Sequence, residues 1–401
     1  MSWETVRFGD LYAVESRNGL TKPSKVRGSG YKMINMGELF ANDRIYDIPM
    51  EFVPLKESEK LNARVECGDL LFARQSLVLE GAGKCSIVME VSPLTVFESH
   101  LIRVRLDRSQ ALPMFYYYYF RSSLSPVKSI VSQCAQAGIR GSDLQELQVI
   151  LPPIKVQQRI AEIISRYDDL IENNQKQIKL LEEAAQRLYK EWFVDLRFPG
   201  HETTPIVDGI PQGWERMVLS EVTSVLKRGI SPKYSDNGKY SVINQKCIRS
   251  SIMDISESRR QEKEYVPTLN LQDSDTVICS TGTGTLGRVG RVYGDYPNTT
   301  FDSHVTLVRA KENPNYIYHV VKSQQEYLMG MGRGSTNQQE LYRDVIERLV
   351  VLCPSQDILL KADRVLNAIH CKIKAVYLQN NLLVESRDRL LPKLMSGELE
   401  V

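Results

Sequence analysis

Hydrophobic and polar positions follow two different patterns along the chain. Short apolar runs interrupted by Gly, Pro, Asn and Asp occupy residues 1–152 and again residues 206–353, and runs such as 69–73, 86–89, 276–279 and 305–308 predict strands. The aromatic segment that follows Pro113 predicts a buried helix. Each of the two regions is therefore expected to form a mixed α/β globular domain.

After each region the spacing of apolar residues becomes that of a heptad repeat. Residues 157–193 contain no Gly or Pro, and their apolar residues recur every three or four positions, as they do again from Leu366 to Leu394. Two long amphipathic helices are predicted, the first of them about 55 Å long at about 1.5 Å per residue. The residues expected to join the helices as a coiled coil are Ile160, Ile164, Ile171, Asn174, Ile178, Leu181, Leu188, Ile369, Ile373, Val376, Asn380, Leu383 and Leu390. The alternative is that each helix only caps its own globular domain.

The two halves of the chain repeat each other. Trp3 recurs as Trp214, Gly19 as Gly229, residues 31–35 as 240–244, and residues 97–105 as 301–309. The offset drifts while the order is kept, which predicts a duplication. The expected fold class is α+β, with two related mixed α/β domains joined by two long antiparallel coiled-coil helices in a pseudo-twofold repeat. The predicted segments are a first domain (1–152), a central helix (153–200), a second domain (201–353) and a C-terminal helix (354–401).

Composition narrows the class of protein without identifying it. The 401 residues are 42% hydrophobic and 25% charged, which excludes collagen-like, mucin-like and wholly disordered chains. Because the formal net charge is only +2, any nucleic-acid binding must come from local basic patches. No signal peptide or membrane span is expected, and the seven cysteines include no CxxC pair. We therefore expect a cytoplasmic protein with reduced thiols, no membrane partner and no metal site.

Motifs that resemble catalytic sites lack the context that their chemistry requires. Residues 282–287 fit GxGxxG, but the residues that follow alternate like a strand instead of opening a helix. The sequence has no P-loop, and Asn313-Pro-Asn315 only approximates the Asn-Pro-Pro motif of a methyltransferase. The duplicated pairs Ser99-His100 and Ser303-His304 are expected to be structural, because adjacent side chains in a strand point to opposite faces. No catalytic residue is predicted.

Basic and amide side chains recur at corresponding positions of the two halves. Both stretches, around residues 16–37 and 225–249, are rich in Lys and Arg and in the Gly, Ser and Pro of loops, where cations reach phosphates and amides read base edges. The alternative for any one cluster is an ordinary solvated loop. The predicted DNA-binding residues are Arg17, Lys22, Lys25, Arg27, Arg74, Gln75, Lys84, Arg140, Lys227, Arg228, Lys233, Arg288, Arg291, Arg333, Asn337 and Gln338.

Three segments carry a resemblance to a known family over the whole chain. They are residues 68–74 (GDLLFAR), 97–100 (FESH) and above all 151–161 (LPPIKVQQRIA), which lead into the central helix. With these segments the chain resembles the specificity subunit of type I restriction-modification systems. The second entry into a helix, at residues 352–356, lacks the second Pro and the paired Gln, whereas residues 390–399 look like the usual ending of the family.

The resemblance implies a subunit without catalytic activity. Two target recognition domains would each read one half of a bipartite, asymmetric site in double-stranded DNA, and the helices would set the half-site spacing and bind two methyltransferase subunits. Restriction subunits would complete this phage-defence complex, and S-adenosylmethionine, ATP and Mg would be bound by the partner subunits, with no cofactor in this chain. A coiled-coil interaction scaffold without DNA recognition is the alternative. The base sequence of the target and its spacer are not readable from these residues.

Overall fold

The computed structural model describes residues 3–133, 137–282, 284–334 and 339–401. The chain divides into two compact units. The first unit contains Met1–Asn173 and Asn380–Val401, and the second contains Asn174–Gln379. Within the described ranges, none of the helices is both long and apolar enough to span a membrane. Each unit contains one globular domain and part of both long helices. This division does not separate the helices from the domains, and the bounds of the four predicted segments therefore stay predictions.

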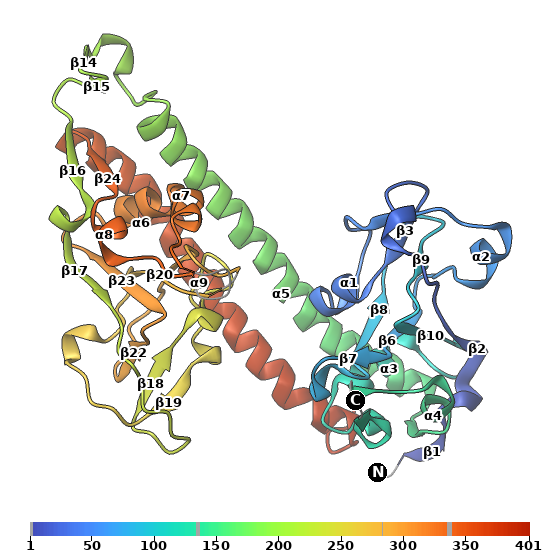
Figure 1. Ribbon diagram of the computed structural model, residues 1–401. Helices are drawn as coiled ribbons and strands as arrows, with labels where there is room; N and C mark the ends of the chain where they lie inside the picture. The colour runs from blue at the N-terminus through green and yellow to red at the C-terminus, as the bar shows by residue number, and fades with distance from the viewer. Residues whose placement is uncertain (1–2, 134–136, 283, 335–338) are drawn as a thin grey trace. The chain divides into compact units, whose positions relative to one another are not determined.

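The first unit is built around a five-stranded sheet (Figure 1). Its strand order is β2 (Tyr12–Asn18), β10 (Leu101–Leu106), β6 (Leu70–Ala73), β8 (Cys85–Val88) and β4 (Arg44–Ile45). Two three-stranded sheets accompany it, one formed by β5 (Glu51–Val53), β3 (Tyr31–Ile34) and β9 (Val96–Phe97), the other by β11 (Ser132–Gln133), β12 (Ala137–Gly138) and β7 (Gln75–Ser76). The pair β1 (Glu4–Arg7) and β13 (Gln148–Leu151) closes the domain, which also contains the short helices α1 (Met36–Ala41), α2 (Glu57–Asn62) and α4 (Gly141–Gln145).

The aromatic segment forms the predicted buried helix, α3 (Pro113–Arg121). Pro113 occupies the first turn, where its missing N–H removes no helical hydrogen bond, and six consecutive aromatic residues from Phe115 are buried. Phe120 packs edge-on against Phe8 and Phe72, and the Tyr116 hydroxyl donates to the carbonyl of Ile150 at 2.9 Å. The helix therefore joins the central sheet to the closing strand pair.

The second unit repeats this arrangement. Its central sheet has the order β17 (Thr223–Arg228), β23 (Val305–Ala310), β20 (Thr276–Cys279) and β21 (Val289–Arg291), and its second sheet the order β19 (Arg259–Gln261), β18 (Tyr240–Ile243) and β22 (Thr299–Phe301). The closing pair is β16 (Glu215–Val218) with β24 (Val350–Cys353), and β14 (Ile206–Val207) pairs with β15 (Ile210–Pro211). The helices are α6 (Pro314–Ser323), α7 (Gln325–Gly330) and α8 (Arg343–Glu347). The predicted duplication is thus confirmed by the equivalent central sheets, second sheets and closing strand pairs, although among the described residues β4 and the pair β14-β15 each occur in one unit only.

Two equivalent glycines show how closely the domains correspond. Gly19 donates its backbone N–H to Leu101, and Gly229 donates its own to Val305. A Cβ atom on Gly19 would lie 2.1 Å from the carbonyl oxygen of Phe97, and one on Gly229 would lie 2.2 Å from that of Phe301. Only glycine fits at either position, because the main chain of the neighbouring strand occupies the space of a side chain.

Two equivalent ion pairs support the central sheets. Arg105 on β10 binds both carboxylate oxygens of the buried Asp69 at 2.7 and 2.8 Å. Arg309 on β23 binds the buried Asp275 in the same way, at 2.7 Å for both bonds. Each carboxylate also accepts a backbone N–H three residues before it, so its charge is satisfied on several sides.

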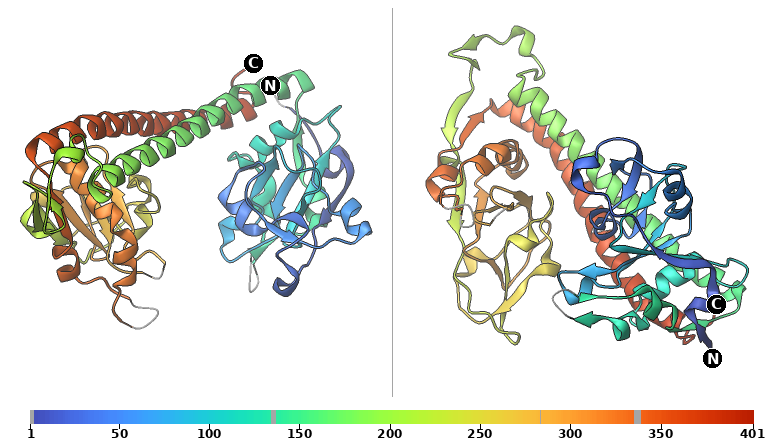
Figure 2. Two further views of the ribbon diagram at one scale, coloured as in Figure 1. Left: turned by 90° about the horizontal axis from the view of Figure 1, so that it is seen from above. Right: turned by 45° about the vertical axis from the view of Figure 1, so that its right-hand side comes forward.

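The long helices are α5 (Ile154–Tyr189), which continues as a π-helical turn (Lys190–Val194), and α9 (Gln356–Met395). Inside each unit they lie side by side (Figure 2). In the first unit Asn380 donates to the carbonyl of Ile171 at 3.3 Å, and Arg387 binds Asp168 at 2.7 Å. From the first of these contacts to the second, the residue number decreases along α5 and increases along α9. The helices are therefore antiparallel, as predicted.

Many seam residues pack against a globular domain as well as against the other helix. Ile160 and Ile164 are fully buried in the core of the first domain together with Leu394 from the end of α9. In the second unit, Ile178, Leu181, Ile369 and Ile373 cluster with Ile252 and Tyr293 of the globular domain. Since both units contain stretches of both helices, the alternative in which each helix caps only its own domain is wrong.

Candidate nucleic-acid interface

The strand register of the first unit gathers polar side chains at one end of its central sheet. Ile102 lies opposite Asn18 and Leu101 lies opposite Ala73, so the end of β2, the start of β10 and the end of β6 coincide. Beyond the strands, the backbone N–H of Arg74 donates to the carbonyl of His100 at 2.8 Å, and the backbone carbonyl of Arg74 accepts the N–H of Ile139 at 2.9 Å. We call the side chains at this place the first polar sheet end: Arg17, Asn18, Arg74, Gln75, His100 and Arg140.

The side chains of the first polar sheet end are only lightly held. Arg17 donates to the Asn62 amide oxygen at 3.0 Å, and Arg74 donates a long bond of 3.4 Å to the carbonyl of Ser99. Among the described residues, the side chains of Gln75 and Arg140 have no hydrogen-bond or ionic partner. These donors and acceptors are therefore available to a ligand.

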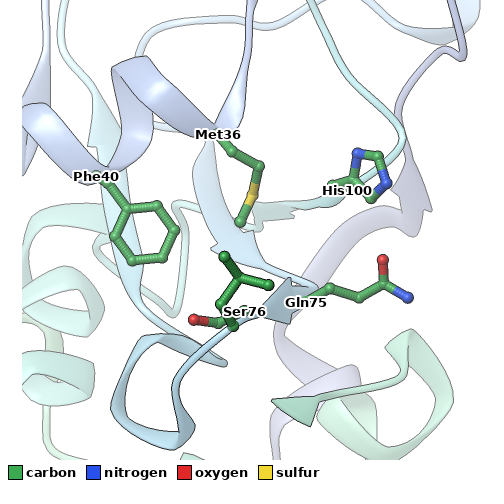
Figure 3. A pocket seen from close by; sticks show the side chains of 6 residues that line it. Met36, Phe40, Gln75, Ser76 and His100 are labelled. Atoms are coloured by element: carbon green, nitrogen blue, oxygen red, sulfur yellow. The ribbon is translucent and has the colours of Figure 1, made fainter. Parts of the chain in front are cut away.

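Two hollows open at this sheet end. The first has a volume of about 350 Å³ and is lined by Met36, Phe40, Gln75, Ser76, Leu77 and His100. Figure 3 shows Met36 and Phe40 projecting from α1 toward the segment after β6, with Gln75 and His100 near each other at one side. The second hollow, of about 430 Å³, includes Arg17, Asn18, Gly141 and Ser142 in its lining. Both are open to solvent and are not closed cavities.

The second unit has an equivalent sheet end. Ser280 donates its N–H to the carbonyl of His304 and accepts one from Leu341, both at 2.8 Å, just as Arg74 contacts His100 and Ile139. Thr281, which follows Ser280, bridges to Glu340 as Gln75 pairs with Gly138. The second polar sheet end is therefore Lys227, Arg228, Ser280, Thr281, His304 and Glu340.

The two polar sheet ends carry different side chains on the same backbone frame. In the second, Arg228 forms an ion pair with Glu340, and the Thr281 hydroxyl bonds His304 Nδ1. In the first, Asn18 and Gly138 stand at the positions of Arg228 and Glu340, so that ion pair has no counterpart. Equivalent frames with different donors and acceptors are able to recognise different ligands.

Three of the predicted basic residues lie in ion pairs beside these sheet ends. Lys22 binds Glu59 at 2.8 Å, Arg27 binds Glu51, and Lys233 binds Glu262 at 2.9 Å. The hydrogen bonds from the two lysines lower the pKa of Glu59 and of Glu262. A cation that is already paired attracts phosphate less, because its carboxylate repels the anion. Lys25 is exposed and, within the described ranges, has no acidic partner.

Lys84, another of the predicted DNA-binding residues, is also partly neutralised. Lys84 donates to the carbonyl of Phe40 at 2.9 Å and lies 3.1 Å from Asp43, which binds Arg121 at 2.7 Å. Burial alone would raise the pKa of Asp43, but the hydrogen bonds and charges of Arg121 and Lys84 outweigh it and lower that pKa. Lys84 therefore supports the fold at this place.

Several sequence predictions need correction. Arg17, Lys227 and Arg228 lie on strands β2 and β17 and not on loops, although they stand near the strand ends. The prediction for Arg291 is wrong: this residue on β21 is 2% exposed, donates to Asn315 at 2.7 Å and lies against the rings of Tyr293 and Tyr318. A guanidinium enclosed in this way cannot reach DNA.

The remaining predicted contacts fall into two groups. Arg288 is half-buried and Arg333 is exposed, with the guanidinium of Arg333 5.6 Å from the centre of the Tyr342 ring. Asn337 and Gln338 lie outside the described residues. Three residues at the sheet ends were not predicted from the sequence: Asn18, Met36 and Thr281. Each of them lies at or just after the end of a duplicated strand, and this position in the repeat could have marked them as candidates.

The Ser-His pairs do not form a catalytic arrangement. Ser99 and His100 lie in the turn before β10, not in a strand as predicted, and Ser303 and His304 lie in the same turn before β23. His100 Nδ1 is 3.4 Å from Glu98, and His304 bonds Thr281, so in the described structure neither histidine activates its neighbouring serine. The strand β21 follows the GxGxxG segment, as the sequence indicated. Among described residues there is no group of three His, Cys, Asp or Glu able to hold a metal ion.

Comparison with known proteins identifies the family. The sequence model described as "Type I restriction modification DNA specificity domain" matches residues 1–183 and 211–358. The chain belongs to the type I restriction-modification DNA specificity family. The two matched ranges correspond to the two globular domains with the adjoining parts of the helices, so the family domain occurs twice.

Individual relatives agree with this assignment. The chain is 27% identical over 354 residues to the MjaIX specificity subunit of Methanocaldococcus jannaschii, covering 84% of this chain and 80% of the relative. It is 30% identical over 160 residues to the EcoKI specificity subunit of Escherichia coli K12, covering 39% of this chain and 33% of the relative. The fold is similar to the crystal structure of a type I restriction-modification S subunit from M. genitalium, with a TM-score of 0.56, 16% identity and coverage of 98% and 96% of the two chains.

Proposed function

We propose that this specificity-family chain binds double-stranded DNA sequence-specifically, with each globular domain reading one half of a bipartite, asymmetric target. The observation that carries the proposal is the pair of polar sheet ends, which share a backbone frame but differ in side chains. Because the two domains have the same backbone arrangement at these sheet ends, each can bind its half-site in the same orientation. Their different hydrogen-bond donors and acceptors would then read different bases. An asymmetric target follows from the difference between Gln75 and Thr281 at equivalent positions.

Phosphate contacts would come from cations without an acidic partner in the described residues. In the first unit these are Arg17, Lys25, Arg74 and Arg140, and in the second they include Lys227, Arg288 and Arg333. Such contacts position the protein on the duplex without reading sequence, and each makes binding more sensitive to salt. The ion-paired Lys22, Arg27 and Lys233 would contribute less.

The long helices would bind the methyltransferase subunits and set the half-site spacing. Their outer surfaces leave large apolar side chains exposed, with Leu170 and Leu382 at 49% and 64% in the first unit and Leu180 and Leu360 at 65% and 60% in the second. Exposed leucines on a helix that already buries its seam support a protein partner. Two methyltransferase subunits and, beyond them, restriction subunits would be those partners.

The chain itself would be a non-catalytic, cytoplasmic subunit that needs no cofactor. S-adenosylmethionine, ATP and Mg would be bound by the partner subunits, since methyl transfer and DNA translocation require them there. Support comes from the described residues, in which the Ser-His pairs are not coupled and the GxGxxG segment precedes a strand.

The experiment is methylation mapping of a host that lacks type I systems and expresses this chain with its own methyltransferase subunit. One bipartite motif with two unequal halves is expected. The purified complex should then shift a duplex that contains this motif, and a duplex with both half-sites scrambled serves as the control. A complex that assembles but methylates and binds no specific sequence would instead support a scaffold without DNA recognition.

A further inference from the structure

The hollow beside Gln75 combines an amide that has no partner among the described residues with an apolar wall. Gln75 stands at its edge, and Met36, Phe40 and Leu77 supply the apolar atoms (Figure 3). Leu77 is 89% exposed and Phe40 is 40% exposed, although both are large hydrophobic residues. Exposed apolar side chains gathered beside a free amide indicate a binding surface.

The main chain around this hollow is closely packed. Gly138 lies opposite Gln75 in the strand pairing, and a Cβ atom there would lie 3.0 Å from the carbonyl oxygen of Arg74. A Cβ atom on Gly81 would lie 2.2 Å from the Ser76 hydroxyl oxygen and 3.2 Å from the Phe40 ring. The loop after β7 therefore closes tightly on Ser76 and Phe40, which keeps the amide and the apolar wall in place.

Only one base pair matches this combination in the major groove. Adenine presents the N6 amino donor and the N7 acceptor, which a single glutamine amide pairs with through two hydrogen bonds, and thymine adds an apolar C5-methyl group. A G·C pair offers two acceptors on guanine and has no methyl group. The hollow thus complements an A·T pair on both its polar and its apolar side.

We propose that Gln75 binds adenine N6 and N7 of one A·T pair in the first half-site, while Met36, Phe40 and Leu77 surround the methyl group of its thymine. This assignment rests on the proposed function, because it requires the first polar sheet end to face the major groove. It makes Gln75 and Leu77 specificity-determining residues and assigns the A·T pair as the ligand of the hollow.

The second unit supplies an internal comparison. Gln245 follows Asn244 as Met36 follows Asn35, and Thr281 stands where Gln75 does, its hydroxyl already bonded to His304. The equivalent place in the second unit therefore has a glutamine, Gln245, where the first has Met36, and a threonine where the first has Gln75. Methyl recognition of this kind is expected in the first half-site only.

Single-atom changes in the DNA test the assignment without any risk to folding. The complex of this chain with its methyltransferase subunit is titrated, at one fixed salt concentration, with duplexes of the mapped target in which each thymine in turn is replaced by uracil. One position in the first half-site should bind about four-fold more weakly, as expected for the loss of one buried methyl group. Replacing its adenine partner by 7-deazaadenine should weaken binding about five-fold through the lost N7 hydrogen bond.

Protein variants identify the contacts. With Leu77→Ser the loss of affinity caused by uracil should become smaller, and with Gln75→Ala the 7-deazaadenine effect should vanish. Thr281→Ala in the second unit is the matched control and should leave both effects unchanged. Gln75→Arg should shift the preferred pair from A·T to G·C, because arginine pairs with guanine O6 and N7.

The outcomes separate this assignment from the proposed function. If the wild-type complex binds its target but no uracil substitution in the first half-site matters, or if that half-site contains no A·T pair, the assignment is overturned and DNA recognition stands. If the wild-type complex binds no specific DNA, both are overturned.

Discussion

Arg387 of α9 donates to the Asp168 carboxylate of α5 at 2.7 Å, and the other oxygen of Asp168 accepts the Tyr118 hydroxyl at 2.9 Å. The side chains of Arg387 and Asp168 are 18% and 10% exposed. One buried carboxylate therefore connects both long helices to the aromatic helix of the first domain. Because a heptad seam position is usually apolar, this charge pair gives the helices a defined register as well as contact.

Removing one member of this pair should destabilise the first unit. Arg387→Ala leaves Asp168 buried without its cation, and we expect a loss of about 3 kcal/mol in the free energy of unfolding, measured in urea. Arg389→Ala is the matched control: Arg389 is 79% exposed and pairs with Glu385 four residues before it, so its loss should matter by less than about 0.5 kcal/mol. Equal effects of the two substitutions would contradict the importance of the buried pair.

Two buried histidines should make the second unit sensitive to acid. His319 and His370 face each other with their Nε2 atoms 3.0 Å apart, and Tyr293 bonds His370 at 2.8 Å. Burial, reinforced by the charge of Arg291, lowers the pKa of His319 to about 3 and that of His370 to about 2. Both imidazoles are therefore neutral in the folded protein.

In the unfolded chain the same histidines take up protons near pH 6.5. The unfolded state then binds more protons than the folded state, so stability is complete above about pH 6.5 and falls as the pH decreases toward 3, by up to about 1.4 kcal/mol per pH unit for each imidazole. His370→Gln should reduce this slope in urea titrations between pH 6.5 and 4. An unaltered slope in the His370 variant would refute the assignment.

The repeat, the two long helices and the buried aromatic helix were predictable because their patterns are local. Residues three, four or seven positions apart face the same side of a helix whatever the rest of the chain does. The polar sheet ends were predicted only in part. Arg74 and Gln75 could be predicted because they follow directly on a recognisable strand. The ion pair of Arg228 with Glu340 joins residues 112 positions apart, and no local pattern predicts it.

Arg291 shows why exposure in particular escapes sequence reasoning. An arginine beside glycines in a basic segment is normally at the surface. Its burial depends on Asn315 and on the rings of Tyr293 and Tyr318, which come together only in the folded domain. Met36 escaped notice for the same reason, since its place beside Gln75 depends on the packing of α1 against the end of the sheet.

The domains should read their half-sites independently. Replacing residues 206–352 with the corresponding segment of another family member should change one half of the methylated motif and preserve the other, as mapped by sequencing methylated DNA from the host. The segment ends before α9 begins at Gln356, so the helices keep their own residues. A reciprocal replacement of residues 3–150 is the control and should change only the other half. Changes in both halves from either exchange would mean that the domains read jointly.

The purified chain alone should not modify DNA. Incubation with its mapped target and radiolabelled S-adenosylmethionine should transfer no methyl group until the methyltransferase subunit is added, because the chain is proposed to contribute recognition and not chemistry. Addition of the methyltransferase subunit without this chain is the second control and should give no methylation specific to the motif. Methyl transfer by the lone chain would refute its non-catalytic role.

The helices should act as a ruler between the half-sites. Seven residues inserted between Asn173 and Asn174 in α5, matched by seven between Gln379 and Asn380 in α9, fall at the boundaries of the compact units and keep the heptad phase. Each helix would lengthen by about 10 Å, and the spacer of the methylated motif should grow by about three base pairs at about 3.4 Å each. Insertion in α5 alone, which shifts Asn174 away from Gln379, should abolish methylation. If the doubly extended chain stays active with an unchanged spacer, the helices are only an assembly surface and do not set the distance.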